Sequence, residues 1–368
     1  NPFPNGLSRL LGAQGGLLTG VGQTLTAGAA RIGDVPTYLN GLTQQFSLGF
    51  QVLLPGAVSV QSGYAGTVSQ RLTISRDVNA YPEEFLALKA RLNASVPNPF
   101  YGIITDPLSG HSAEYIQQSQ LLVPHPQFGG FTGNDPPWAN SIYHAFQLRI
   151  EKRMAKGLQF LVTYTNSKSI DNASVAGGNV TWLGGFTSLQ DPNQRFLERS
   201  LSQFDIPQVL QVSYVYQLPW GRGKKWGTNW NPWLDGFVGG WQTNGIWRFD
   251  TGQPISLGLS GGQSVISYGG QKPNLLAPLQ ANDKSKWLSD GYFANPDVAV
   301  KPPSYTVGSA PRMLPNVRFP GSNTAALSLF KEVPLTKLRE GARIEFRAEA
   351  FNALNHPQFG CINSTVNT

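Results

Sequence analysis

The chain has 368 residues, only 13% of them charged, and a net charge of +7. This length suits one large β domain or two ordinary domains. No apolar run approaches the roughly 20 residues that a membrane-spanning helix needs. The basic residues are scattered along the chain instead of clustered, which argues against nucleic-acid binding. The single cysteine, Cys361, excludes an intrachain disulfide and a cysteine-rich metal site.

Most of the chain alternates between apolar and polar residues, whereas residues 1–40 show no clear period and are interpreted as loop. Alternation sends successive side chains to opposite faces of a β-strand, so each strand has one apolar and one polar face. The pattern predicts about eight strands, within residues 43–54, 58–64, 141–152, 158–165, 210–217, 241–250, 325–332 and 342–353.

The connections between these strands alternate between short and long. Short ones fall at 53–57, 154–157 and 335–341, with a slightly longer one at 219–236; long ones fall at 71–140, 171–205 and 251–324. A transmembrane β-barrel has tight periplasmic turns and long outward loops. We therefore predict an all-β fold, an antiparallel transmembrane β-barrel wall in the bacterial outer membrane. Its first long extracellular loop carries a short helix near residues 81–93, where Pro and two Glu form a first turn.

Residues 342–353 carry four charges that separate the strand interpretation from a helical one. In a helix the charges would spread around the cylinder, whereas in a strand all four fall on one face. In a barrel, this polar face lines the interior. The candidate interior residues are Arg149, Glu151, Arg248, Asp250, Arg343, Glu345, Arg347 and Glu349. They would either pack against a plug or contact a ligand on its path.

The opposite face of the same strands is apolar. If the chain is in a membrane, that face contacts lipid, and the candidate residues are Phe46, Leu48, Phe146, Leu148, Leu210 and Val212. Aromatic residues near the predicted strand ends are typical of the girdles at membrane interfaces. They are Tyr64, Tyr164, Tyr216, Trp220, Trp226, Trp230, Trp233 and Trp241.

The long loops contain aromatic residues among Gly, Asn, Gln and Ser. Aromatic rings beside amide groups suit a sugar ring or a peptide, and they also suit packing of one loop on another. The candidate ligand-contact residues are Trp138, Trp182, Phe186, Tyr268, Trp287 and Tyr292, with Phe293 beside them.

No pattern of catalytic or metal-binding residues stands out. The four His have no zinc-ligand spacing, and neither a Gly-x-Ser-x-Gly motif nor a phosphate-binding loop is present. Glu345 and Glu349 could mimic a glycosidase pair, but the interleaved Arg343 and Arg347 would keep both ionised. We expect no enzyme activity, no metal and no cofactor.

Several segments together are similar to a known family. They include Val-Pro-Asn-Pro-Phe-Tyr-Gly at 96–102, the strand pair around 143–168, Tyr-Gln-Leu-Pro-Trp-Gly-Arg-Gly-Lys at 216–224, Gly-Trp-Gln-Thr-Asn-Gly-Ile at 240–246, Leu-Ser-Leu-Phe-Lys at 327–331 and 347–360. In this order and spacing, the chain resembles the C-terminal barrel of TonB-dependent outer-membrane receptors. The most similar group has an N-terminal carboxypeptidase-regulatory-like domain.

This resemblance implies a barrel of about 22 strands filled by a plug. It also implies uptake of an extracellular ligand, with energy from an inner-membrane TonB-type complex that acts through the plug. The plug and the closing strands have no counterpart in residues 1–368, and both chain ends fall on the long-loop side. We therefore expect the chain to be a fragment of one barrel domain, in contact with outer-membrane lipid. The resemblance does not name the ligand, which could be a glycan, a peptide or a metal chelate.

An alternative is a soluble or surface-attached β domain that binds carbohydrate through its aromatic loops. The two hypotheses differ in the surroundings of the apolar face, which contacts lipid in the first and a packed protein core in the second. A self-contained channel is a third hypothesis, which the outward position of both ends disfavours.

Overall fold

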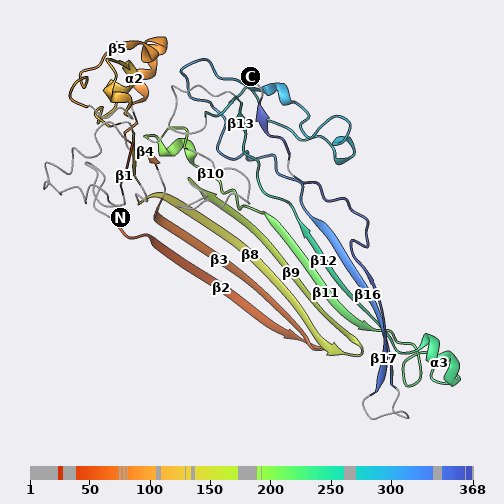
Figure 1. Cartoon of the computed structure of the whole chain (residues 1–368). Helices are drawn as coiled ribbons and strands as arrows, with labels where there is room; N and C mark the ends of the chain where they lie inside the picture. Colours follow the sequence, from red (N-terminus) through yellow and green to blue (C-terminus); the bar gives the residue numbers. More distant parts are fainter. Residues whose placement is uncertain are drawn as a thin grey trace, which may run out of the picture.

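The computed structural model describes residues 24–27, 39–73, 76–77, 79–80, 82–104, 109–128, 130–133, 137–172, 189–191, 193–260, 271–334, 342–360 and 362–366. Its main feature is a long antiparallel sheet that runs diagonally across Figure 1. The long strands are β2 (Leu42–Leu54), β3 (Val58–Thr73), β8 (Pro137–Ala155), β9 (Leu158–Asp171), β11 (Gln208–Gln217), β12 (Trp241–Asp250), β16 (Asn323–Pro334) and β17 (Arg343–Ala350).

These eight strands lie in the order β17-β16-β12-β11-β9-β8-β3-β2, so each pairs with the next long strand along the chain. A short strand, β10 (Ser200–Leu201), adds to one end of β9. The eight strands predicted from the alternation are confirmed, as are their antiparallel pairings. Antiparallel neighbours follow directly from short connections, because a tight turn can only return the chain beside itself.

Some predicted boundaries were wrong. The strand predicted to end at Tyr64 continues to Thr73, and the one predicted to end at Thr165 continues to Asp171, where it is still paired with β8. Both tyrosines are therefore in mid-strand instead of at strand ends. The backbone ladder continues through segments whose side chains no longer alternate, because the ladder bonds are made by the main chain.

Two further boundaries also differ from the prediction. β17 ends at Ala350, and a turn with Asn352 at φ 50° follows it. The N-terminal segment is not all loop, since β1 (Thr24–Ala27) forms a small sheet with β7 (Gly130–Gly133) and β4 (Arg76–Asp77).

The connections are sorted by length between the two ends of the sheet. At one end, lower right in Figure 1, tight turns join β2 to β3 and β8 to β9. Gly56 (φ 85°) and Gly157 (φ 78°) supply the left-handed backbone of these turns. The connection from β11 to β12 reverses at the same end and contains the helix α3 (Pro232–Val238).

The described parts of the long connections lie at the opposite end (Figure 1). The first contains η1 (Glu83–Asn93), η2 (Gly110–Ser112), α2 (Gln118–Leu121) and the pair β5 (Ser95–Pro97) and β6 (Tyr115–Gln117). η1 confirms the predicted short helix, although it is a 3-10 helix with a kink at Lys89. The later connections contain η4 (Arg195–Glu198), β13 (Gly258–Leu259), β14 (Asn274–Leu275), η6 (Lys284–Lys286), η7 (Pro296–Val298) and β15 (Ala299–Val300); β18 (Thr365–Val366) pairs with β13.

The buried apolar side chains lie mostly in the long connections instead of in the sheet. One cluster is formed by Ile255, Leu257, Leu279, Ala310, Leu314 and Val317. In the eight described long strands, the buried apolar residues are alanines: Ala139, Ala145 and Ala325. The sheet is therefore not held together by a packed core on either face. No described helix has the length and apolar character needed to cross a membrane.

Candidate functional site on the two faces of the sheet

The register places the predicted apolar residues on one face of the sheet, which we call the apolar face. Leu48 is opposite Tyr64, which is opposite Phe146; Leu148 is opposite Tyr164, which is opposite Leu210. Directly opposed residues share a face, and alternation adds Phe46 and Val212 to it. Leu48 is 60% exposed and Phe146 is 46% exposed. Phe46 is exposed as well, whereas Leu148, Leu210 and Val212 are partly exposed, and none of the six is buried by the part of the chain that the structure describes.

The other face, which we call the polar face, is equally continuous. One row of opposed residues crosses seven strands from β2 to β16: Gln51, Gln61, Arg149, Thr163, Gln211, Arg248 and Thr324. Alternation places Glu151 and Asp250 on the same face. On β17, the four charges from Arg343 to Glu349 also lie on it, because Arg347 is opposite Phe330. The structure therefore brings all eight predicted interior residues to one face.

The charges on this face pair along their own strands. Arg149 Nη2 is 2.9 Å from Glu151 Oε2, and Arg347 Nη2 is 3.1 Å from Glu345 Oε1. Arg248 Nε is 3.4 Å from Asp250 Oδ2. The first two pairs are exposed, and exposed pairs contribute up to about 1 kcal/mol each to stability. The Asp250 carboxylate is instead buried and also accepts from the Ser322 hydroxyl. These exposed pairs therefore contribute little to the stability of the fold. Their charged groups remain able to contact a partner surface.

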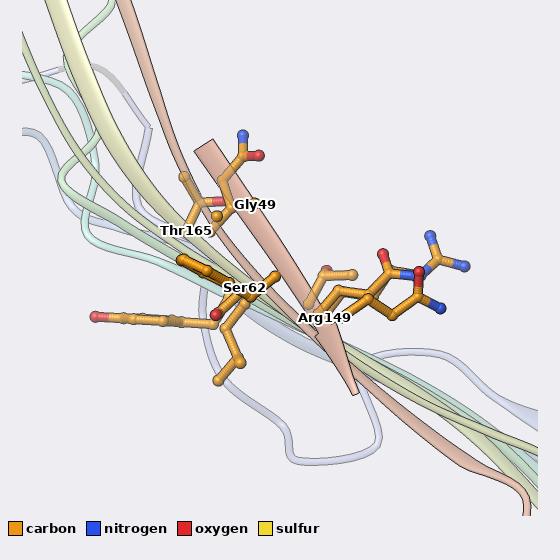
Figure 2. A pocket seen from close by; sticks show the side chains of 12 residues that line it. Gly49, Ser62, Arg149 and Thr165 are labelled. Atoms are coloured by element: carbon orange, nitrogen blue, oxygen red, sulfur yellow. The ribbon is translucent and has the colours of Figure 1, made fainter. Parts of the chain in front are cut away.

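The polar face has a hollow of about 540 Å³ across β2, β3, β8 and β9 (Figure 2). Gly49 and Gly63 are opposite each other, and their lack of side chains deepens it. The lining includes two polar-face rows, which contain Gln147, Arg149 and Thr165, on either side of one apolar-face row. The hollow therefore opens on the polar face, with backbone as its floor. Amides, hydroxyls and one guanidinium offer hydrogen bonds to a polar partner.

A second hollow of about 490 Å³ lies near the short-turn end. Its lining includes Lys224, Asn244, Glu345 and Arg347. Arg347 also lies over the Phe330 ring, 4.7 Å from its centroid. The hollow has charges of both signs, which suits contact with a polar protein surface better than selection of one ion.

The predicted loop aromatics have different surroundings. Trp182, Phe186 and Tyr268 lie outside the described residues. Trp138 packs beside Ala139, Leu189 and Leu72. Trp287 contacts the rings of Tyr292 and Phe359, each with a centroid separation of 5.0 Å. Their ligand contact stays a prediction, and the rings of Trp138 and Trp287 pack within the loops.

The packing of Tyr292 is close. Its hydroxyl donates to the Arg318 carbonyl oxygen, and its ring packs on the loop cluster around Leu279 and Val317, as does Phe293. Burial raises the pKa of the Tyr292 phenol above its ordinary value. This ring therefore helps to hold the loop together.

The long-loop end also contains a buried ionic network, which we call the rim network and which the sequence reasoning missed. Lys272 Nζ is 2.7 Å from Glu198 Oε2, and both side chains are almost completely buried. Arg312 forms an ion pair with Asp171 and donates to the Glu198 carbonyl oxygen at 2.9 Å. These contacts join the end of β9 to the connections 172–207 and 251–322.

Asp205, Arg318 and Gln190 extend the rim network. Asp205 pairs with Arg318 at 2.6 Å and accepts from the Ser169 amide at 2.6 Å. Gln190 donates to the Gly308 carbonyl oxygen at 2.8 Å and accepts from the Lys272 amide at 2.8 Å. Burial lowers the pKa of Lys272, while the Glu198 carboxylate opposes that shift. The sequence contains one signal for the rim network: charges are scarce in this chain, so charged residues in its loops stand out.

Metal chemistry gains no candidate here. Within the described ranges, no three His, Cys, Asp or Glu side chains lie together in a way that could hold a metal ion. Glu345 and Glu349 both contact Arg347. These contacts keep the two carboxylates charged on the polar face. The absence of a cofactor remains a prediction.

The geometry can be compared with known proteins. A fold comparison matches the outer membrane transporter YddB from Escherichia coli, with 10% sequence identity and a TM-score of 0.41. The match covers 91% of this chain and 31% of that transporter, so the chain spans about a third of its length. Comparison with curated protein sequences gives no match. The family model for an outer membrane beta barrel domain matches residues 1–368. The chain therefore belongs to the outer membrane beta-barrel domain family.

Proposed function

We propose that this chain is part of the barrel wall of a TonB-dependent receptor that takes up an extracellular ligand. The apolar face contacts outer-membrane lipid, and the polar face lines the interior and packs against a plug. The long connections lie outside the cell and meet the ligand. An inner-membrane TonB-type complex supplies energy through the plug. The role is transport, not catalysis.

The observation that carries this proposal is the exposure of large side chains on the apolar face. Phe46, Leu48 and Phe146 are each about half exposed. Large apolar side chains that are exposed together on one face are unfavourable in water, and their exposure becomes favourable when lipid covers them. The soluble carbohydrate-binding alternative requires the same side chains to be buried in a protein core, so their exposure disfavours it.

The edges of the sheet support a wall larger than the eight described strands. Among the described strands, β2 and β17 each have one long neighbour. In hydrocarbon, the free N–H and C=O groups of such an edge cost several kcal/mol each if left unpaired. We infer that further strands continue the wall beyond both edges, as the resemblance to a larger barrel implies.

The polar face supports an interior role in the same way. Its charges are paired along each strand, but are exposed enough to meet a second surface. The hollow at Gly49 and Gly63 provides room for one. A polar plug needs partners along the whole wall, whereas a ligand path needs them only locally. We favour plug contact for most of these residues, with Arg149 as the candidate for ligand contact.

The first experiment compares two adjacent wall positions with Cys361 removed. The protein, expressed with its whole natural chain, carries an environment-sensitive probe on Leu148→Cys or on Gln147→Cys and is refolded in lipid vesicles. Quenchers in the lipid phase should reduce fluorescence at 148 and not at 147, since adjacent residues point to opposite faces. Protection of position 148 in a protein that folds without detergent would favour the soluble alternative.

A second experiment tests the energy coupling separately. The same protein, purified in detergent, is passed over the immobilised periplasmic domain of the TonB protein from the source bacterium. Retention supports a TonB-dependent receptor. A folded, lipid-embedded protein that is not retained would be a barrel of another kind.

A further inference from the structure

The connection between β11 and β12, residues 218–240, presents aromatic side chains at the short-turn end of the sheet. Trp233 is 81% exposed and Phe237 is 75% exposed, both on α3. Trp226 is also exposed, and the Lys225 ammonium lies 5.1 Å from the centroid of its ring. Large aromatic side chains exposed together need a partner surface.

α3 is attached to the apolar face of the sheet, not to the polar one. Trp241 and Lys331 are opposite each other on that face, and Phe346 is opposite Lys331. Trp241 Nε1 donates to the Phe237 carbonyl oxygen at 2.8 Å, and Lys331 Nζ donates to the Gly239 carbonyl oxygen at 2.6 Å. The exposed aromatics therefore continue the apolar face at its short-turn end.

The connection is built rigidly. Asn231 caps α3 by accepting from the Leu234 amide at 2.7 Å, and Asp235 Oδ1 accepts from the Arg222 amide at 2.7 Å. A Cβ on Gly239 would lie 2.3 Å from that carboxylate oxygen, so the packing leaves room only for glycine. The backbone that carries Trp233 and Phe237 is therefore fixed, which lowers the entropy lost when these rings bind a partner.

The charge of the connection is one-sided. Residues 218–240 contain Arg222, Lys224 and Lys225 against one acidic residue, Asp235, whose carboxylate is already used inside the connection. All three basic residues are exposed. Cations beside exposed aromatic rings match an interface with anionic headgroups above an acyl layer, where rings enter the boundary and cations meet phosphate.

We propose that residues 218–240 form a membrane-interface anchor that binds anionic phospholipid of the periplasmic leaflet. Trp233 and Phe237 enter the headgroup–acyl boundary, and Lys225, whose ammonium lies beside the exposed Trp226 ring, contacts phosphate. Lys224 does not take part, since its ammonium donates to Gln217 Oε1 on the polar face. Lys331 and Trp241 fix α3 at the depth where the apolar face ends. The inference rests on the proposed orientation of the apolar face toward lipid.

The test uses the same vesicle-embedded protein, with phospholipids brominated near the headgroup or deep in the acyl chain. The fluorescence lost in a Trp233→Phe variant isolates the signal of Trp233. Shallow bromines should quench that signal more strongly than deep ones. Brominated phosphatidylglycerol should also quench it more strongly than brominated phosphatidylcholine. In Lys225→Gln, this preference should fall by roughly fivefold. Lys284→Gln, a lysine of the opposite end, should leave it unchanged.

The outcomes separate the anchor from the barrel proposal. If Leu148→Cys is quenched but Trp233 is not, the barrel proposal stands and the anchor is overturned. If neither is quenched, the barrel proposal fails and the anchor fails with it. Quenching of Trp233 with equal response to both lipids would overturn the assignment of anionic phospholipid. Far-UV circular dichroism on each variant verifies that the sheet has formed.

Discussion

The Lys272 ammonium donates to the Glu198 carboxylate at 2.7 Å, although 74 residues separate the two in sequence. Lys272 is 7% exposed and Glu198 is fully buried. The pair joins two long connections at the rim of the sheet, where β9 ends. The order of the rim therefore depends on a long-range ionic contact as well as on apolar packing.

Removing one partner of this pair should loosen the rim. Glu198→Gln leaves the Lys272 ammonium buried without a carboxylate, which should cost about 3–5 kcal/mol of local stability. Hydrogen exchange of residues 189–205 and 271–315 measures the effect. Arg149→Gln breaks an exposed pair and is the matched control, with an expected loss below about 1 kcal/mol. Similar losses in both variants would contradict the special role of the buried pair.

Gly308 should not tolerate a side chain. A Cβ there would lie 1.8 Å from the Lys272 carbonyl oxygen and 2.8 Å from that of Pro273. Because these atoms are backbone, Gly308→Ala should destabilise the loop by about 1–3 kcal/mol. Protease sensitivity of connection 251–322 reports this change. Gly110→Ala, with no atom within 4 Å of the added Cβ, should have no such effect.

Tyr292 should make the loop sensitive to alkaline pH. Its folded-state pKa is raised by burial, so the folded loop keeps the phenol proton after the unfolded loop has lost it. The stability that Tyr292 provides is present below about pH 10 and is lost as pH rises through the folded pKa. Near-UV circular dichroism of the wild type and Tyr292→Phe, during melting at several pH values, measures the difference. A stability difference that does not change from about pH 9 to 11 would refute this assignment.

The two opposed glycines should control access to the hollow on the polar face. The nearest atom to a Cβ on Gly63 is the Leu48 carbonyl oxygen at 3.4 Å, and on Gly49 it is the Ser62 carbonyl oxygen at 3.8 Å. Gly49→Val/Gly63→Val should therefore fold, because β-branched residues suit strands. It should slow labelling of Gln147→Cys by a bulky water-soluble maleimide. An unchanged rate would show that the hollow does not open on that face.

Lys331 should hold α3 against the sheet. Lys331→Met removes the donor of a buried hydrogen bond to the Gly239 carbonyl oxygen. The loss should lower local stability by about 1–3 kcal/mol. Hydrogen exchange of residues 233–241 measures it. Lys152→Met breaks a similar bond of 2.7 Å to the Gly56 carbonyl oxygen in an exposed turn, so its cost should be smaller. Equal effects would mean that burial does not strengthen the α3 contact.

Strand number, antiparallel order and the assignment of side chains to faces could all be predicted from the sequence. Alternation in β8 sends Phe146 and Gln147 to opposite sides whatever the neighbours are. The eight candidate interior charges therefore share a face as predicted. Strand ends were less predictable: β3 continues past Tyr64 because its ladder is made by backbone groups that carry no side-chain signal.

By itself, then, the sequence determined that eight long strands form, which face each side chain occupies, and which end has the long connections, because these depend on local periodicity and loop length. Only the tertiary structure decided which distant groups meet. Arg312 and Asp171 are 141 residues apart, and Lys331 meets the end of α3 from another strand. Such contacts depend on how whole connections fold back on the two ends of the sheet, and no local pattern encodes that.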